Sequence, residues 1–183
     1  MEPLLILPVI AFAILLVLFG LVLRRAGRFL AQTRDVERFR RQAGDLAGRV
    51  ETSLAEISTR IDAVRRGQMG ADALADDLKA SLDAVARYTD EARALRPAAA
   101  AATIRDEIIG ELERTARALE MVEHGRSIQT SARAGARELE AQTSIKRGYL
   151  NVLHAREAIA RQAQAAAALS VSDATNRIQR RNV

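Results

Sequence analysis

The sequence predicts an all-α protein in which a single apolar helix at the N-terminus continues into a long helix and then into an antiparallel coiled-coil or helical-bundle domain. Two observations support this prediction. The first is a run of 20 residues, Leu4 to Leu23, that contains no charged or amide side chain. The second is a series of apolar residues from Val36 to Val64 at steps of three and four, the spacing of a heptad seam with one stutter at Val50 to Leu54.

The apolar run 4–23 has the length of a membrane-spanning helix. At 1.5 Å per residue, 20 residues form a helix about 30 Å long, the hydrocarbon thickness of a bilayer. The run is followed by Arg24 and Arg25 rather than by the small residues of a signal-peptide cleavage site, which predicts an uncleaved anchor. The alternative is a buried core helix, but soluble helices rarely remain apolar on every face over this length.

Charges on the two sides of the run predict its orientation. Only Glu2 precedes the run, whereas Arg24, Arg25, Arg28 and Arg34 follow it closely. Because the basic flank of a membrane helix stays inside, we expect a single-pass protein of the cell membrane with its N-terminus outside and its C-terminal domain in the cytoplasm. The absence of cysteine is compatible with a reducing compartment.

The remaining chain, 24–169, is expected to be one cytoplasmic α-helical domain. Its 49% hydrophobic fraction comes largely from 36 alanines, and tryptophan is absent, so thin helix interfaces are favoured over a thick globular core. Glycine or proline interrupts the helical pattern at three places, which predicts four helices. They cover about 24–66, 71–96, 98–124 and 126–169.

Each predicted helix has an apolar seam. In the first helix the seam is Phe29, Val36, Phe39, Ala43, Leu46, Val50, Leu54, Ile57, Ile61 and Val64. In the second it is Leu74, Leu78, Leu82, Val85, Tyr88, Ala92 and Leu95. The third carries Ile104, Ile108, Leu112, Leu119 and Val122, and the fourth Ile128, Ala132, Gly135, Leu139, Ile145, Tyr149, Val152, Leu153 and Ile159.

The breaks between these helices differ in the strength of their signals. Gly67 and Gly70 predict a tight reversal, and Pro97 ends the second helix and suits the start of the third. Gly125 followed by Ser127 has the pattern of a C-terminal glycine and an N-cap, which predicts a third break. The alternative is that Gly125 remains helical and the third and fourth helices are continuous.

The net charge of +5 is concentrated at the two ends of the cytoplasmic part. Residues 24–41 carry seven arginines against two acidic side chains, and the tail, 170–183, carries three arginines against Asp173. We expect the tail to be flexible and its arginines to contact anionic lipid if the last helix returns beside the first. The predicted membrane-surface contacts are Arg24, Arg25, Arg28, Arg177, Arg180 and Arg181. The alternative is a solvated tail.

The sequence predicts no catalytic, cofactor-binding or metal site. His154 and His124 could each share a helix face with a carboxylate, Glu157 and Glu120, but a metal site in a bundle requires several converging carboxylates. Glycine-rich phosphate loops and zinc-ligand spacings are absent from the sequence. We therefore expect a protein that is not an enzyme and requires no cofactor.

The predicted function is that of a membrane-anchored helical scaffold or adaptor that acts through helix–helix association. Its expected partners are the anionic lipid of the cytoplasmic face and other proteins, or further copies of itself, bound through coiled-coil seams. Nucleic acid is not expected. The alternative is a subunit of a larger membrane complex, such as a stalk, export or division assembly. The plan of an N-terminal span and a charged helix resembles the peripheral-stalk b subunits of bacterial ATP synthases, but Gly67 and Pro97 interrupt the long helix of that family.

Overall fold

The described part of the protein is entirely built from helices. The computed structural model describes the backbone of residues 3–97, 99–131 and 134–169, and side chains mainly from Arg34 onward. Within these ranges the chain has no β-strand, and the all-α prediction is confirmed. The helices are α1 (Pro3–Arg65), α2 (Ala75–Ala94), α3 (Ala102–Gln129) and α4 (Glu138–Ala168), with short 3-10 turns η1 (Ala71–Leu74), η2 (Ala99–Ala101) and η3 (Ala134–Arg137) before the last three.

Helix α1 contains the apolar run 4–23 and continues without interruption into the bundle. Within that run the structure describes the exposure of three residues, Leu16, Phe19 and Gly20, and all three are exposed. A search of the described residues finds no helix that has both the length and the apolar character needed to cross a membrane.

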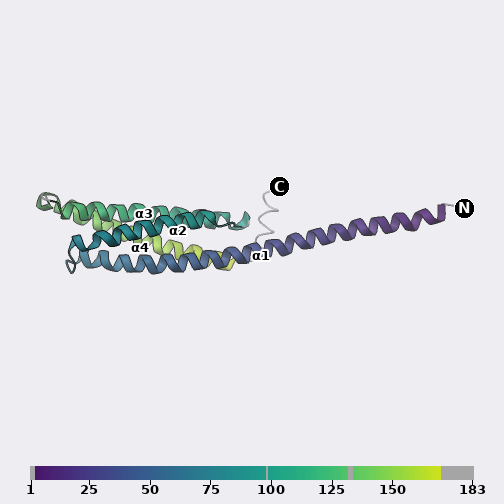
Figure 1. Cartoon of the computed structure of the whole chain (residues 1–183), viewed down its shortest axis with the longest axis horizontal. Helices are drawn as coiled ribbons and strands as arrows, with labels where there is room; N and C mark the ends of the chain where they lie inside the picture. The colour runs from purple at the N-terminus through teal and green to yellow at the C-terminus, as the bar shows by residue number, and fades with distance from the viewer. Residues whose placement is uncertain (1–2, 98, 132–133, 170–183) are drawn as a thin grey trace.

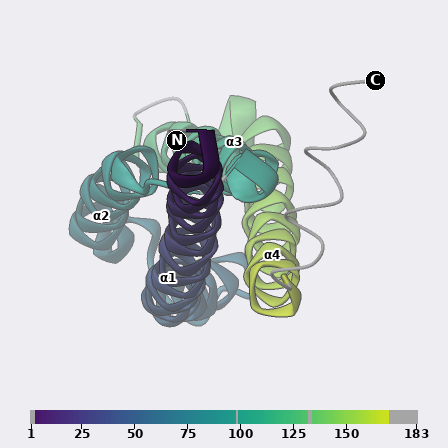
Figure 2. The same ribbon diagram turned by 90° about the vertical axis from the view of Figure 1, so that its right-hand side faces the viewer.

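The four helices form an antiparallel bundle in which consecutive helices are neighbours and α4 closes the ring against α1. Figure 1 shows the N-terminal half of α1 projecting as a rod from the end of the bundle where α4 terminates. Seen along the axis in Figure 2, α2 and α4 lie on opposite sides, with α1 and α3 between them. The contact between α3 and α4 is the most extensive of the four.

Ion pairs between helices mark the register of three of these interfaces. Arg49 and Arg60 of α1 pair with Glu91 and Asp77 of α2, respectively. Arg93 of α2 lies 2.9 Å from Glu113 of α3, and Glu51 of α1 lies 2.8 Å from Arg156 of α4. These side chains are partly exposed, so the pairs contribute little to the free energy of unfolding but show which levels of the helices face each other.

The bundle core contains most of the predicted seams. Every seam position of the first helix from Val36 to Val64 is buried, as are all five positions of the third. In α2, Leu82 and Tyr88 are half-buried and the other predicted positions are buried. The wrong predictions are Gly135 and Leu139, which are exposed because they lie at the turn before α4 and in its first residues. Phe29 and Ala132 lie outside the described side chains.

A glycine ends α1 where the sequence predicts a reversal. Gly67 has a φ of +70°, a left-handed conformation that costs other L-residues about 1–2 kcal/mol. Its N–H donates to the carbonyl of Val64 at 2.9 Å, and the N–H of Gln68 donates to the carbonyl of Ala63 at 2.8 Å. This pair of hydrogen bonds is the Schellman motif, which satisfies carbonyls that the helix end would leave without partners.

Gly67→Ala is expected to destabilise the fold by about 1–2 kcal/mol, because alanine must adopt the left-handed conformation. Gly70→Ala is the matched control: its backbone is extended, with a φ of −68°, and a Cβ there would meet nothing within 4 Å. Urea denaturation of the full chain, followed by circular dichroism, measures both changes. Equal stability of the two variants would contradict the assigned role of Gly67.

Pro97 separates α2 from α3 as predicted, with slightly different bounds. Helix α2 ends at Ala94 rather than at Arg96. Proline disfavours the α conformation at the residue directly before it, Arg96, and the chain leaves the helix one residue earlier. Leu95 is accordingly extended, with a ψ of 134°. The α-helical hydrogen bonding of α3 begins at Ala102, after the 3-10 turn η2.

The predicted break at Gly125 is wrong. Helix α3 continues through Gly125 to Gln129, and α4 begins at Glu138 rather than at Arg126. Gly125 is buried, and a Cβ added to it would lie 2.7 Å from the carbonyl oxygen of Ala141 and from Cγ1 of Ile145. The glycine therefore permits the close approach of α4 and does not terminate a helix.

Candidate functional site

The six arginines predicted to contact the membrane surface are not described at the level of side chains. Arg24, Arg25 and Arg28 lie on the backbone of α1, with side chains outside the described set, and Arg177, Arg180 and Arg181 lie in the part of the chain beyond the described residues. The contact between the two groups thus stays a prediction.

The helix that leads to the tail nevertheless returns alongside α1. Because Arg156 pairs with Glu51, and the two helices are antiparallel, Ala168 lies level with about residue 39 of α1. The last helix therefore returns beside the first, which is the condition on which the predicted contact of the tail with lipid depends. Helix α4 ends about 16 Å along α1 from Arg28, at 1.5 Å per residue.

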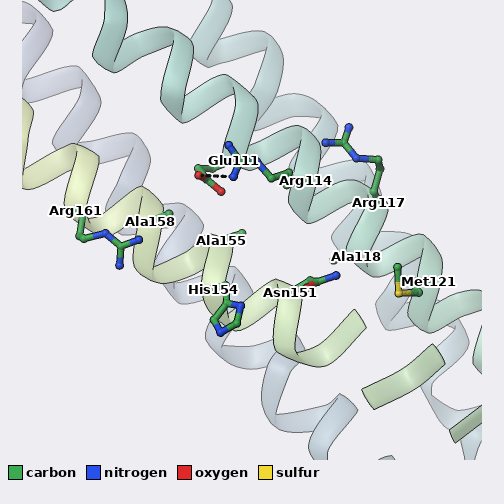
Figure 3. A pocket seen from close by; sticks show the side chains of 10 residues that line it. All are labelled: Glu111, Arg114, Arg117, Ala118, Met121, Asn151, His154, Ala155, Ala158 and Arg161. Atoms are coloured by element: carbon green, nitrogen blue, oxygen red, sulfur yellow. Dashed lines mark ion pairs between the residues drawn. The ribbon is translucent and has the colours of Figure 1, made fainter. Parts of the chain in front are cut away.

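The most enclosed hollow among the described pockets is a groove of about 460 Å³ between α3 and α4 (Figure 3). Its lining combines cations with small apolar side chains. The lining residues are Glu111, Arg114, Arg117, Ala118, Met121, Asn151, His154, Ala155, Ala158 and Arg161. At 1.5 Å per residue, the stretch from Asn151 to Arg161 gives the groove a length of about 15 Å along the helix axis.

Small residues make this groove possible by bringing the two helices close together. Gly148 of α4 packs directly on α3: a Cβ there would lie 2.5 Å from Cγ2 of Val122 and 2.6 Å from the carbonyl oxygen of Ala118. Beyond this contact Ala155 and Ala158 are buried and form a low floor, because neither side chain extends past its Cβ. Longer side chains that line the groove, among them Arg114, Arg117 and Arg161, surround these alanines and form the rim of the groove.

The rim is basic and only partly neutralised. Arg114 lies 3.1 Å from Glu111, and Arg161 lies 3.9 Å from Glu157, just within ion-pair distance. Arg117 has no ion pair with any carboxylate in the part of the chain that the structure describes. Figure 3 shows Arg117 and Arg161 on opposite walls, so their guanidinium groups do not converge on one point.

This arrangement suits an extended acidic surface better than a single small anion. A phosphate group is usually held by donors that surround it, whereas these cations are spread along and across the groove. The alanine floor adds an apolar surface on which a partner helix can pack. His154 and Asn151 supply further polar contacts at one end of the groove.

The two histidines occupy different environments. His154 lines the groove, and His124 lies 3.6 Å from Glu140 of α4 rather than beside Glu120 of its own helix. The Arg137 guanidinium, with a smaller contribution from His124, holds the pKa of Glu140 below its ordinary value. Within the described ranges, histidines and carboxylates do not gather in groups of three that could hold a metal ion.

A second ion pair lies within the last turns of α3. Arg126 donates to Glu123 at 2.6 and 2.7 Å, and these hydrogen bonds lower the pKa of the Glu123 carboxyl. The pKa of Arg126 is raised, first by Glu123 and to a smaller extent by Asp72 of η1. Because the ion pair is between residues of one helix turn, it stabilises α3 locally.

The sequence alone did not identify the groove. Arg117 and Arg161 both fit a solvated helix face, and only the register of α3 against α4 places them around one hollow. The nearest signal in the sequence is the pair of small residues Ala155 and Ala158 beside arginines, which is too common to be diagnostic. Comparisons with protein-family models, with curated proteins and with solved structures found no match for this chain.

Proposed function

We propose that the chain is a membrane-anchored scaffold or adaptor without catalytic activity, whose helical bundle acts by binding protein surfaces. The observation that carries the proposal is the continuity of α1, which joins the apolar run 4–23 to the bundle core as one helix. The buried seam begins at Val36, so a helical spacer of about 20 Å separates the end of the run from the core. A rigid spacer of this kind holds a binding domain at a fixed height above a bilayer.

The charge distribution supports the cytoplasmic orientation of the bundle and its contact with anionic lipid. Arg24, Arg25 and Arg28 follow the apolar run directly, and each cation near an anionic leaflet contributes about 1 kcal/mol. Helix α4, which precedes the basic tail 170–183 in the sequence, runs back along α1 toward the end of the bundle from which α1 projects. Both groups of arginines would then lie at the membrane surface.

The α3–α4 groove supports a binding role over a catalytic one. Its three arginines and low alanine floor form a surface for an acidic partner. General acid–base catalysis needs a titratable side chain held within reach of a reacting group. Glu111, the one carboxylate among the residues that line the groove, lies 3.1 Å from Arg114 and is engaged by that cation.

A reporter fused after Val183 is expected to be cytoplasmic, because the arginines that follow Leu23 oppose translocation. The test uses two reporters, one active only in the cytoplasm and one active only outside it, on otherwise identical full chains. The cytoplasmic reporter should be active and the other silent. The reverse pattern would overturn the proposed orientation, and recovery of the full chain in the soluble fraction would overturn the anchor.

A subunit of a larger membrane complex, such as a stalk, export or division assembly, remains the second candidate. One observation favours it: Leu139 at the tip of the α3–α4 hairpin is 78% exposed, and Leu150 on α4 is 41% exposed. The bundle seams of the described residues are otherwise satisfied within one chain. Extraction in mild detergent followed by size analysis distinguishes the candidates, since a stalk or assembly subunit would co-purify with unrelated chains in fixed ratio.

A further inference from the structure

The cations of the α3–α4 groove lie at a defined level of the bundle. Glu51 pairs with Arg156, which is at the middle of the α4 stretch that lines the groove, Asn151 to Arg161. Because α1 and α4 are antiparallel, the groove is level with about residues 46–56 of α1. Its centre is therefore about 40 Å along α1 from Leu23, at 1.5 Å per residue. Lipid headgroups at the end of the apolar run cannot reach that level.

Acidic side chains of α2 lie at the same level. Asp83 falls between Asp77 and Glu91, which pair with Arg60 and Arg49, so Asp83 is level with about residue 55 of α1. Asp90, one residue before Glu91, is level with about residue 50. Both aspartates therefore lie within the span of heights that the groove occupies.

The outward face of α2 is suited to lie in the groove. Asp76, Asp83 and Asp90 are seven residues apart, nearly two turns, so they share one exposed face of the helix. Asp90 lies 3.2 Å from Arg93, whereas Asp76 and Asp83 have no ion pair within the described residues. The helix carries five acidic and three basic side chains in all. The exposed residues between the aspartates are two alanines, Ala80 and Ala86, and two cations, Lys79 and Arg87, so the face has one more acidic than basic side chain among these positions.

The two surfaces of one molecule cannot meet each other. In Figure 2, α2 lies on one side of the bundle and α4 on the other. A complementary pair of surfaces on different sides of a protein produces a head-to-tail contact between copies. Copies anchored in one bilayer share the same orientation and height, and confinement to the membrane raises their effective concentration.

We infer that copies of this chain in one membrane associate side by side, with the outer face of α2 of one copy, which carries Asp76, Asp83 and Asp90, seated in the basic α3–α4 groove of the next. The inference rests on the proposed membrane anchor, since the anchor sets the common height. The contact repeats from copy to copy and therefore forms a row or a ring. Arg117 of the groove and Asp83 of α2, each without an ion pair in the described part of its own chain, face each other across this contact.

Cross-linking between two copies tests the contact, because the chain contains no cysteine of its own. One tagged full-length copy carries Asp83→Cys, and a second, with a different tag, carries Arg117→Cys. After oxidation in intact membranes we expect a disulfide-linked pair that contains both tags. The control replaces Arg117→Cys by Glu56→Cys, an exposed position of α1 at the same height but outside the groove. We expect the yield of the disulfide-linked pair to exceed that of the control at least about threefold, which is the effect of one exposed charge pair on an equilibrium.

Charge reversal provides a second readout that does not depend on cysteine geometry alone. Adding Asp90→Lys to the first copy should lower the cross-linking yield, and adding Arg114→Glu to the second should restore it. Equal yields for the groove and control positions would overturn the inference, as would a yield that is insensitive to both charge changes. If the chain is absent from the membrane fraction, the proposed anchor fails. If it is present there without groove-specific cross-linking, only the side-by-side contact fails.

Discussion

Gly148→Leu is expected to prevent the close packing of α3 against α4 and to destabilise the bundle by about 3 kcal/mol or more. Even the first added atom, the Cβ, would lie 2.6 Å from the backbone carbonyl of Ala118, and backbone cannot rotate away as a flexible side chain can. The helices must therefore separate, and the neighbouring buried residues, such as Val122 and Val152, lose contacts along the interface.

Gly48→Leu is the matched control for this change. Gly48 is also in a helix, but it is exposed and a Cβ there would meet nothing within 4 Å. Because leucine is a far better helix former than glycine, this variant should be as stable as the unchanged chain or more stable by up to about 1 kcal/mol. Thermal unfolding of full chains in the same detergent measures both. Destabilisation of equal size in the two variants would contradict the assigned role of Gly148.

Two glycines, Gly67 at the end of α1 and Gly125 inside α3, show why the sequence predicts some elements of the fold and misses others. The seam from Val36 to Val64 could be predicted because a heptad repeat records burial directly in the spacing of residues. A single glycine does not show in the sequence whether it ends a helix or allows two helices to pack closely. Gly67 and Gly125 look alike in sequence, yet the first has a positive φ at a helix end and the second is inside a helix where another backbone passes.

The same limitation explains the error in the bounds of α4. If Gly125 is a helix end, the fourth helix starts at Arg126 and its seam includes Gly135 and Leu139, whereas α4 begins at Glu138. Their exposure follows from the actual turn between α3 and α4. The groove was missed for a related reason, because it depends on how the two helices are placed against each other. That placement is determined by the glycine contacts, which no local pattern contains.

The predicted membrane-surface site differs from the groove because its prediction depends on charge and not on how the helices pack. The arginines after Leu23 and those of the tail are predicted to contact the membrane surface because they are basic and, if the last helix returns beside the first, lie near the end of the apolar run. This prediction requires no knowledge of side-chain contacts. The structure shows in addition that α4 runs along α1 in the direction of Arg28. The contact with lipid is therefore best tested through the anchor itself.

Replacing both Ala13 and Val17 by arginine is expected to abolish membrane anchoring. The two positions are four residues apart near the centre of the apolar run, where each arginine adds about 2.5–3.5 kcal/mol to the free energy of insertion. Together they add about 5–7 kcal/mol, because two charges on one helix turn cannot both reach the same interface. The variant should move from the carbonate-resistant membrane pellet to the soluble or aggregated fraction.

The control adds the same two arginines to the bundle, as Ala80→Arg and Ala86→Arg. Both positions are exposed on α2, so the control changes the net charge equally without burying a cation. It should remain in the membrane pellet in the same proportion as the unchanged chain. Retention of the Ala13 and Val17 variant in that pellet would contradict the anchor, because contacts of the bundle with the membrane surface would then suffice to hold the chain there. A loss that is confined to the variant in the apolar run would assign the anchor to that run, since only there does added charge oppose insertion.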